Sequence, residues 1–180
     1  LNIYGNHFEG PIPEGLVESM PMLKSFTVSN NHLTGPLPKA FSKLAHNMTN
    51  LDVDGNFLTG TVPAYLNDML MLRTLNLNDN QFTGKMPDLS SLGGLMYFGM
   101  GLNEEQKEIP DERYLPRMPL FFKISKNGKG DRSLPDPRRV PNVEGLAFTG
   151  GFKGDIPVDF FTTLSKLDNL IVLTFCDYDV

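Results

Sequence analysis

The chain has 180 residues, of which 40% are hydrophobic and 21% are charged, and its formal net charge is −5. This composition suits one globular domain or an array of stacked units. An acidic chain does not favour binding to nucleic acid or other polyanions, and no run of residues is long and apolar enough to span a membrane. Cys176 is the only cysteine, so the chain has no disulfide framework.

An eight-residue motif recurs at a fixed period in the first half of the chain. Each copy begins with an asparagine and ends with a proline, and the copies are Asn6–Pro13, Asn31–Pro38, Asn56–Pro63 and Asn80–Pro87. Successive asparagines are 25, 25 and 24 residues apart. A period of this length predicts a solenoid, in which each repeat stacks on the next.

Each motif asparagine follows an apolar alternation that fits L-x-x-L-x-L-x-x-N. In the second repeat this alternation runs from Leu23 through Phe26 and Val28 to Asn31. A period of two predicts a short strand with Phe26 and Val28 facing inward and their neighbours on the open face. The asparagine amide can then bond backbone groups of the turn that no sheet ladder satisfies.

The strand anchors continue to the end of the chain, although the motif itself decays after Asn80. Their spacing of 23 to 27 residues predicts about eight repeats, anchored near Leu1, Phe26, Leu51, Leu75, Phe98, Phe122, Leu146 and Leu173. Residues 104–142 match the motif poorly, but two 24-residue steps fit between Phe98 and Leu146. We therefore predict a degenerate sixth repeat there rather than a loop insertion, and one solenoid domain over residues 1–180.

Both ends of the sequence lie within a repeat, and neither carries the polar cap that normally closes a solenoid. Leu1 and Ile3 begin the chain as strand residues, and Phe175 lies on the last predicted strand. We therefore expect a fragment of a longer array that exposes apolar residues at both ends.

The repeats resemble the plant-type leucine-rich repeat, whose consensus carries L-T-G-x-I-P after N-x-L. Leu33–Pro38 (LTGPLP) and Phe82–Pro87 (FTGKMP) carry the resemblance most clearly. It implies an α/β solenoid: a right-handed superhelix with a parallel β-sheet on the concave face and an extra strand from the T-G-x-I-P segment. It also implies ligand binding on that concave face, as in receptor-like kinases, receptor-like proteins and secreted inhibitors of cell-wall-degrading enzymes. The paired-cysteine caps, membrane span and kinase motif of such proteins are absent from this sequence.

Stacked strands bring equivalent outward residues into columns across the sheet. Repeats two to four place hydroxyl, amide and carboxylate groups in these columns, and the aromatic residues Tyr97 and Phe121 follow in repeats five and six. A polar patch beside aromatic rings suits a peptide or glycan partner, although the alternative is an ordinary solvated face. Substitutions in one outward set are expected to change stability little: Asn50, Asp52, Asp54, Thr74, Asn76 and Asn78. The candidate ligand-binding residues are Tyr4, Thr27, Ser29, Asn50, Asp52, Asp54, Asn76, Asn78 and Tyr97.

Other side chains that could carry chemistry have simpler interpretations. Asp52 and Asp54, with Asp79 one repeat further on, could act as acid and base or bind a cation, but no third catalytic group matches them. His7 and His32 occupy equivalent positions in adjacent repeats, which predicts a surface ladder with too few ligands for a zinc site. We therefore expect no enzyme activity, no cofactor and no metal site.

Two further features bear on partners and location. Residues 113–139 contain eight basic residues against two acidic ones. They could attract an acidic partner such as a pectin-like polyanion, or they could simply keep a poorly packed repeat soluble. No nucleic-acid-binding signature accompanies them. Asn47 begins the N-glycosylation sequon Asn-Met-Thr, which gives modest support for secretion.

The sequence therefore predicts a non-catalytic module of an extracellular receptor-like protein that binds a peptide, protein or glycan on its concave face. Two alternatives stay open. One is a secreted inhibitor of a cell-wall hydrolase, and the other is the sensor portion of a receptor kinase whose catalytic domain lies outside this sequence. Any membrane anchor would lie outside it as well.

Overall fold

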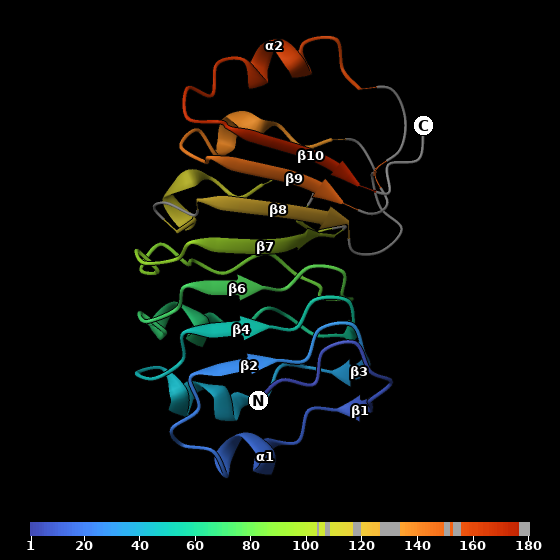
Figure 1. The fold of residues 1–180 in the computed structure, drawn as a ribbon, viewed down its shortest axis with the longest axis vertical. Coiled ribbons are helices and arrows are strands. Elements are labelled where there is room, and N and C mark those ends of the chain that lie inside the picture. The colour runs from blue at the N-terminus through green and yellow to red at the C-terminus, as the bar shows by residue number, and fades with distance from the viewer. Residues whose placement is uncertain are drawn as a thin grey trace.

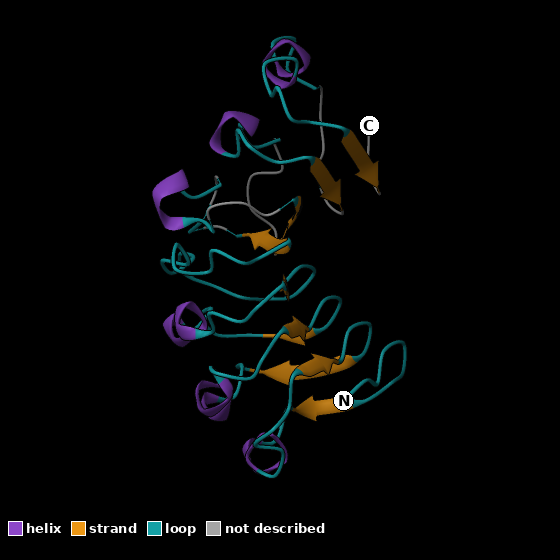
Figure 2. Cartoon of the chain, turned by 60° about the vertical axis from the view of Figure 1, so that its left-hand side comes forward, coloured by secondary structure: helices purple, strands orange, loops and turns teal. Residues whose placement is uncertain are grey.

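The computed structural model describes residues 1–103, 105–106, 109–116, 120–126, 134–149, 152 and 156–176. Over these residues the chain winds into a curved stack, with the strands of the main sheet lying one above another (Figure 1). Figure 2 shows the short helices along the outer side of the arc, so the main sheet forms its concave face. The described part of the chain is therefore a solenoid, as the repeat period predicts.

The predicted alternation forms a parallel sheet of seven strands in the order β10-β9-β8-β7-β6-β4-β2. The strands are β2 (Ser25–Thr27), β4 (Asn50–Asp52), β6 (Thr74–Asn76), β7 (Tyr97–Leu102), β8 (Phe121–Lys126), β9 (Gly145–Thr149) and β10 (Val172–Cys176). Their register aligns the predicted anchors in one row, which runs Phe26, Leu51, Leu75, Phe98, Phe122, Leu146 and Leu173. Leu1 extends this row, because its carbonyl accepts the N–H of Thr27 at 3.0 Å and Asn2 forms a parallel bridge with Thr27.

The strand predicted in the degenerate sixth repeat is β8, and it lies between β7 and β9. Phe122 and Ile124 are both fully buried. The ring of Phe122 stacks on the ring of Phe98, with the two centroids 5.2 Å apart. Two apolar side chains at the right spacing thus keep this repeat in the stack, even though the surrounding motif is lost.

A smaller parallel sheet follows the turn in the first three repeats. It consists of β1 (Glu9–Pro11), β3 (His32–Gly35) and β5 (Phe57–Leu58), in that order. The extra strand that the resemblance implies is therefore present, but it lies mostly before the Gly-x-hydrophobic-Pro segment. Gly35 ends β3 with a φ of 74°, a conformation that residues with a Cβ atom rarely adopt.

Short helices close the outer side of the stack. The label η denotes a 3-10 helix. The helices are α1 (Glu14–Glu18), η1 (Lys39–Leu44), η2 (Ala64–Asp68), η3 (Glu112–Tyr114), η4 (Pro137–Arg139) and α2 (Phe160–Leu164). The longest of these described helices has six residues, so packing against the core rather than helix propensity maintains them. Glu14 also joins two repeats, because its carboxylate accepts the backbone N–H groups of Lys39 and Ala40 at 2.7 Å each.

The motif asparagines connect the backbones of neighbouring repeats. The side-chain amide of Asn56 donates to the carbonyls of Val28 and Val53 at 3.0 and 3.1 Å. Its oxygen accepts a backbone N–H of the preceding repeat at 3.0 Å. Asn31 and Asn80 make equivalent bonds. The prediction that this asparagine satisfies backbone groups of the turn is confirmed. Its bonds give the buried N–H and C=O groups of the turn the partners that buried polar groups require.

Strand residues at the ends of the stack are less buried than their equivalents inside it. Leu1 is 39% exposed, and Leu173 and Phe175 are only partly buried. Phe122 and Ile124, which occupy the same positions within the array, are fully buried. The apolar residues at both ends of the described chain thus lack the full cover that a neighbouring repeat provides.

Candidate ligand-binding face

The outward residues of the main sheet form the columns that the sequence predicts. The strand register places Thr27, Asp52, Asn76, Gly99 and Lys123 side by side, from β2 to β8. These strands line the concave side of the arc, opposite the helices (Figure 2). The polar groups of repeats two to four are therefore neighbours in space.

Three of the candidate residues are less accessible than their outward positions predict. Ser29, Asn76 and Asn78 have exposed fractions of 2%, 7% and 0%. Asn78 donates its side-chain N–H to Asn76 Oδ1 at 2.9 Å, and Ser29 donates its hydroxyl to Asp52 Oδ2 at 3.3 Å. The expectation of small stability effects assumes exposed side chains, and the burial of Asn76 and Asn78 contradicts that assumption. Ser29 is buried as well, and removing a buried hydrogen-bonded group leaves its partner unsatisfied.

The remaining candidates are at least partly accessible. Tyr4 is 61% exposed. The half-buried members are Thr27, Asn50, Asp52, Asp54 and Tyr97. Asn50 links two strands, because its amide donates to Ser25 Oγ at 3.2 Å and to Thr27 Oγ1 at 3.1 Å. These side chains are the ones that a partner on the concave face could contact without rearrangement.

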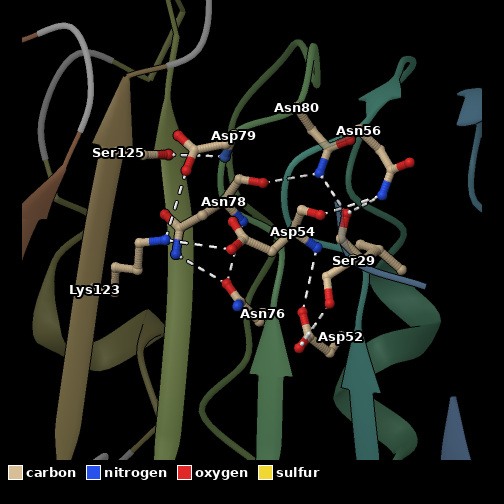
Figure 3. A network of polar contacts seen from close by, with 11 residues as sticks. Ser29, Asp52, Asp54, Asn56, Asn76, Asn78, Asp79, Asn80, Lys123 and Ser125 are labelled. Carbon is tan, nitrogen blue, oxygen red and sulfur yellow. Dashed lines mark hydrogen bonds and ion pairs between the residues drawn. The ribbon is translucent and has the colours of Figure 1, made fainter. Parts of the chain in front are cut away.

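A group that the sequence patterns do not predict lies at the centre of this face (Figure 3). The ammonium of Lys123 lies 3.3 Å from Asp54 Oδ2 and 3.5 Å from Asp79 Oδ2. The side chains of Lys123 and Asp54 are each only 18% exposed. Both distances exceed the roughly 2.7–2.9 Å of a close ion pair, so the ammonium is shared between two carboxylates. We call Asp54, Asn78, Asp79 and Lys123 the Lys123 cluster.

The Lys123 cluster joins repeats that are not adjacent in the array. Lys123 belongs to the sixth repeat, whereas Asp79 belongs to the fourth. Ser125 of the sixth repeat makes a similar connection, because its Oγ accepts the backbone N–H of Asp79 at 3.0 Å. On the fifth repeat, Gly99 and Gly101 pair with Lys123 and Ser125. Since these glycines carry no side chains, the sixth repeat can reach across the fifth.

The carboxylates of Asp52, Asp54 and Asp79 affect the pKa values of groups on this face. Burial raises the pKa of Asp79; the charge of Lys123 opposes this rise and the charge of Asp54 adds to it. Burial also raises the pKa of the Tyr97 phenol, and the charges of Asp54, Asp52 and Asp79 raise it further. The phenol therefore lies within electrostatic reach of all three carboxylates, and the surroundings of Lys123 are net negative.

The cluster also contains acceptor oxygens that no donor satisfies. Asp54 Oδ1 and Asn78 Oδ1 are buried and have no hydrogen-bond partner within the described part of the chain. A buried, unsatisfied acceptor costs about 1–3 kcal/mol, and native structures contain few of them. The arrangement can thus accept further N–H donors, particularly cationic ones.

Two aromatic rings border the cluster on β7 and β8. Tyr97 and Phe121 stack with their centroids 5.5 Å apart and their planes inclined by 6°. Phe121 in turn covers Gly145, where a Cβ atom would collide with the ring. The aromatic border that the sequence predicts beside the polar patch is therefore present.

The other sequence candidates lie elsewhere. His7 and His32 form the predicted ladder, with ring centroids 5.4 Å apart, and Phe57 continues it at 5.8 Å. Among the described residues, no group of three or more His, Cys, Asp or Glu side chains could hold a metal ion. Asn47 is half-buried and donates its amide to the carbonyl of Pro21 at 3.0 Å; its glycosylation stays a prediction.

The basic stretch over residues 113–139 contains local ion pairs. Arg113 Nε lies 2.9 Å from Asp111 Oδ1, and Arg138 Nη2 lies 2.6 Å from Asp136 Oδ2. Lys123 is part of the cluster on the concave face. Outside the described residues lie Arg117, Lys129 and Arg132, together with the side chain of Lys126. Among the described basic side chains of this stretch, Arg113, Lys123 and Arg138 thus pair with carboxylates.

Comparisons with known proteins agree with this geometry. The family model "Leucine Rich Repeat" matches residues 22–44 and 71–92, and no curated protein matches the sequence. The chain is similar to the ectodomain of the Arabidopsis thaliana receptor kinase GASSHO1/SCHENGEN3, solved in complex with CASPARIAN STRIP INTEGRITY FACTOR 2, with 30% identity over 97% of this chain and a TM-score of 0.67. It is also similar to the ectodomain of the Arabidopsis receptor kinase HAESA in complex with an extended IDA peptide hormone, with 26% identity over 94% of this chain and a TM-score of 0.66.

A plant ice-binding protein has a TM-score of 0.69, with 22% identity over 99% of this chain and 56% of its own. At that identity the similarity shows the fold alone. The chain spans only 20% and 28% of the GASSHO1/SCHENGEN3 and HAESA chains. No described helix is long and apolar enough to cross a bilayer. The repeat model, the parallel sheet and these similarities agree: the chain is a plant-type leucine-rich repeat solenoid that resembles part of a receptor kinase ectodomain.

Proposed function

We propose that the chain is a non-catalytic binding module of an extracellular receptor-like protein, and that it recognises a peptide or protein ligand on its concave face. The observation that carries this proposal is the polar face of repeats two to six, with its unsatisfied acceptors and its aromatic border. The GASSHO1/SCHENGEN3 and HAESA ectodomains support it, because each was solved in complex with a ligand.

The accessible and the buried residues of the face have different roles in this proposal. Thr27, Asn50, Asp52 and Tyr97 are partly exposed and contact the ligand. Ser29 and Asn76 are buried and hold the face in shape. An enclosed polar group beside an aromatic ring is typical of recognition surfaces. A secreted inhibitor of a cell-wall hydrolase would use the same scaffold, but no contact described above favours that alternative.

A matched pair of variants tests where the ligand binds. Asp52→Arg places a long cationic side chain on the concave strand β4, and Asp68→Arg makes the same change of charge on the exposed end of η2, on the outer side. Each immobilised variant is offered the small-peptide fraction of the source organism's extracellular fluid, and captured peptides are identified by mass spectrometry.

We expect Asp68→Arg to retain the saturable peptide set of the wild type and Asp52→Arg to reduce its capture by about tenfold or more, because an interface tolerates poorly a large charge at its centre. Circular dichroism confirms that both variants are folded. Equal capture by both folded variants would place the binding surface away from the concave face.

A further inference from the structure

We propose that the Lys123 cluster is a subsite for an arginine side chain of the ligand, and that Lys123 fills this subsite as a displaceable placeholder in the unbound chain. The inference rests on the proposed function and adds the chemical class of one ligand group. It follows from the acceptors of the cluster, from their fixed orientation and from the charge around them.

The Lys123 cluster contains more hydrogen-bond acceptor oxygens than the ammonium group of Lys123 satisfies. Lys123 reaches Asp54 Oδ2 at 3.3 Å and Asp79 Oδ2 at 3.5 Å, while Asp54 Oδ1 and Asn78 Oδ1 remain without a partner. A guanidinium presents five N–H donors in a planar fork and can bind a carboxylate through two parallel bonds, whereas an ammonium offers three donors on a flexible stem. An arginine therefore matches this set of oxygens better than the resident lysine.

Asn78 provides an observation that is independent of the carboxylates. Its side chain is fully buried, and its amide nitrogen donates to Asn76 Oδ1 at 2.9 Å. This bond fixes which end of the amide faces which neighbour, because Asn76 Oδ1 requires a donor. The unpaired oxygen of Asn78 consequently lies on the side of its amide away from Asn76, within the Lys123 cluster (Figure 3). Asn76 Oδ1 accepts both the backbone N–H and the side-chain amide of Asn78, so it holds this neutral acceptor in a fixed orientation.

Charge and space also favour a cationic side chain. Within the described part of the chain, Asp54 and Asp79 share one cation, Lys123, and Asp52 Oδ1 accepts the backbone N–H of Asp54. Replacing that cation by another therefore preserves the charge of the cluster. The contacts of Lys123 are long, and its four-carbon stem lets it swing into solvent. The stacked rings of Tyr97 and Phe121 border the same face.

Small probes test this subsite without the natural ligand. Nα-acetyl-arginine methylamide is compared with its citrulline counterpart, which has nearly the same shape but no charge. Binding to the ¹⁵N-labelled chain is followed by NMR at the backbone N–H of Asp79 and the side-chain amide of Asn78. We expect the arginine probe to bind at least about tenfold more tightly than the citrulline probe, as charge-assisted hydrogen bonds require.

Two substitutions in the cluster are expected to act in opposite directions. Lys123→Met removes the placeholder and should tighten binding of the arginine probe severalfold. Asp54→Asn removes a carboxylate and should weaken it by about tenfold. Asp68→Asn on η2 makes the same change outside the cluster and should have no effect. If Asp54→Asn does not give the NMR spectrum of a folded chain, Asp79→Asn replaces it, because the Asp79 side chain is 40% exposed.

The opposite directions distinguish a ligand subsite from a purely structural tie between repeats. Equal binding of the two probes, or weaker arginine binding by folded Lys123→Met, would overturn the proposal. Competition by Ca²⁺ for the same NMR shifts, stronger than that of the arginine probe, would overturn it in favour of a metal-ion site. None of these results depends on the capture experiment, so a difference between Asp52→Arg and Asp68→Arg would still support binding on the concave face.

Discussion

The first four repeats and the following two end their concave strands in different ways. In the first four, the residue before the motif asparagine has a positive φ: the values are 67° at Gly5, 54° at Asn30, 62° at Gly55 and 48° at Asp79. The equivalent residue of the fifth repeat is Leu102, which is the last residue of β7. Accordingly β2, β4 and β6 have three residues each, whereas β7 and β8 have six.

This difference shows that strand length and stacking depend on different residues. A left-handed residue turns the chain out of the sheet, and Gly, Asn and Asp adopt that conformation far more readily than Leu. β7 therefore continues where β6 stops. Stacking depends instead on inward residues such as Phe98 and Phe122, which are buried whether or not the turn is regular. The longer β8 also contains Ser125, which contacts the fourth repeat.

The largest expected effect comes from the core of the degenerate sixth repeat. Phe122→Ala removes a fully buried ring that stacks on Phe98, and we expect the free energy of unfolding to fall by about 3–5 kcal/mol. Phe57→Ala is the control, because Phe57 is 44% exposed and its loss should cost far less. Denaturant unfolding measures both. Equal effects would mean that inward residues do not maintain the sixth repeat.

A smaller effect is expected at the left-handed position. Gly55→Ala places a Cβ atom at a φ of 62° and close to the side-chain oxygen of Asn30, so we expect a loss of about 1–2 kcal/mol. At Gly93 a Cβ atom would have open space around it, and Gly93→Ala should change stability by no more than about 0.5 kcal/mol. Thermal unfolding compares the two variants. A loss at Gly93 as large as that at Gly55 would contradict the role given to the turn.

The smallest expected effect is a dependence on pH with opposite signs at two aspartates. Burial raises the pKa of Asp79 in the folded chain, so its contribution to stability decreases as the pH rises through that native pKa and increases on acidification. Hydrogen bonds from the Ser90 hydroxyl and backbone lower the pKa of Asp88. The contribution of Asp88 is therefore present above its unfolded pKa and is lost as the pH falls through its native pKa.

NMR titration of the two carboxyl groups measures these shifts directly. Stability measured against pH for Asp79→Asn and Asp88→Asn then isolates each contribution. The stability of Asp79→Asn, measured relative to wild type, should decrease on acidification. The relative stability of Asp88→Asn should decrease as the pH rises from the acid range. A native pKa of Asp79 below that of Asp88 would contradict the burial of the Lys123 cluster.

Much of the fold can be predicted from the sequence because its determinants are local and periodic. The spacing of Leu1, Phe26 and their equivalents predicts the register, and the amide chemistry of Asn56 predicts its bonds across the turn. Even β8 follows from two inward residues at the right distance. The positions of the candidate residues follow from the sequence but their burial does not, because Asn78 and Ser29 are buried and bond to the side chains of Asn76 and Asp52 in neighbouring columns.

The Lys123 cluster could not be predicted in the same way. Lys123 and Asp54 are 69 residues apart, and their contact depends on the curvature of the sheet and on the missing side chains of Gly99 and Gly101. Columns derived from the sequence place each residue beside its equivalent in the adjacent repeat. They do not show that a long side chain crosses an intervening repeat, although two glycines in adjacent outward columns indicate where such a crossing has room.

The bond between the Asp79 N–H and Ser125 Oγ has a consequence for how the array opens. Repeat proteins generally unfold as a row of units coupled only to their neighbours, so that a boundary between folded and unfolded segments can form at any joint. With the fourth repeat bonded to the sixth, a boundary on either side of the fifth must break this bond as well as the local sheet ladder. Opening at either joint of the fifth repeat therefore costs more than the sheet ladder alone requires, which favours partial unfolding at joints that no such bond crosses.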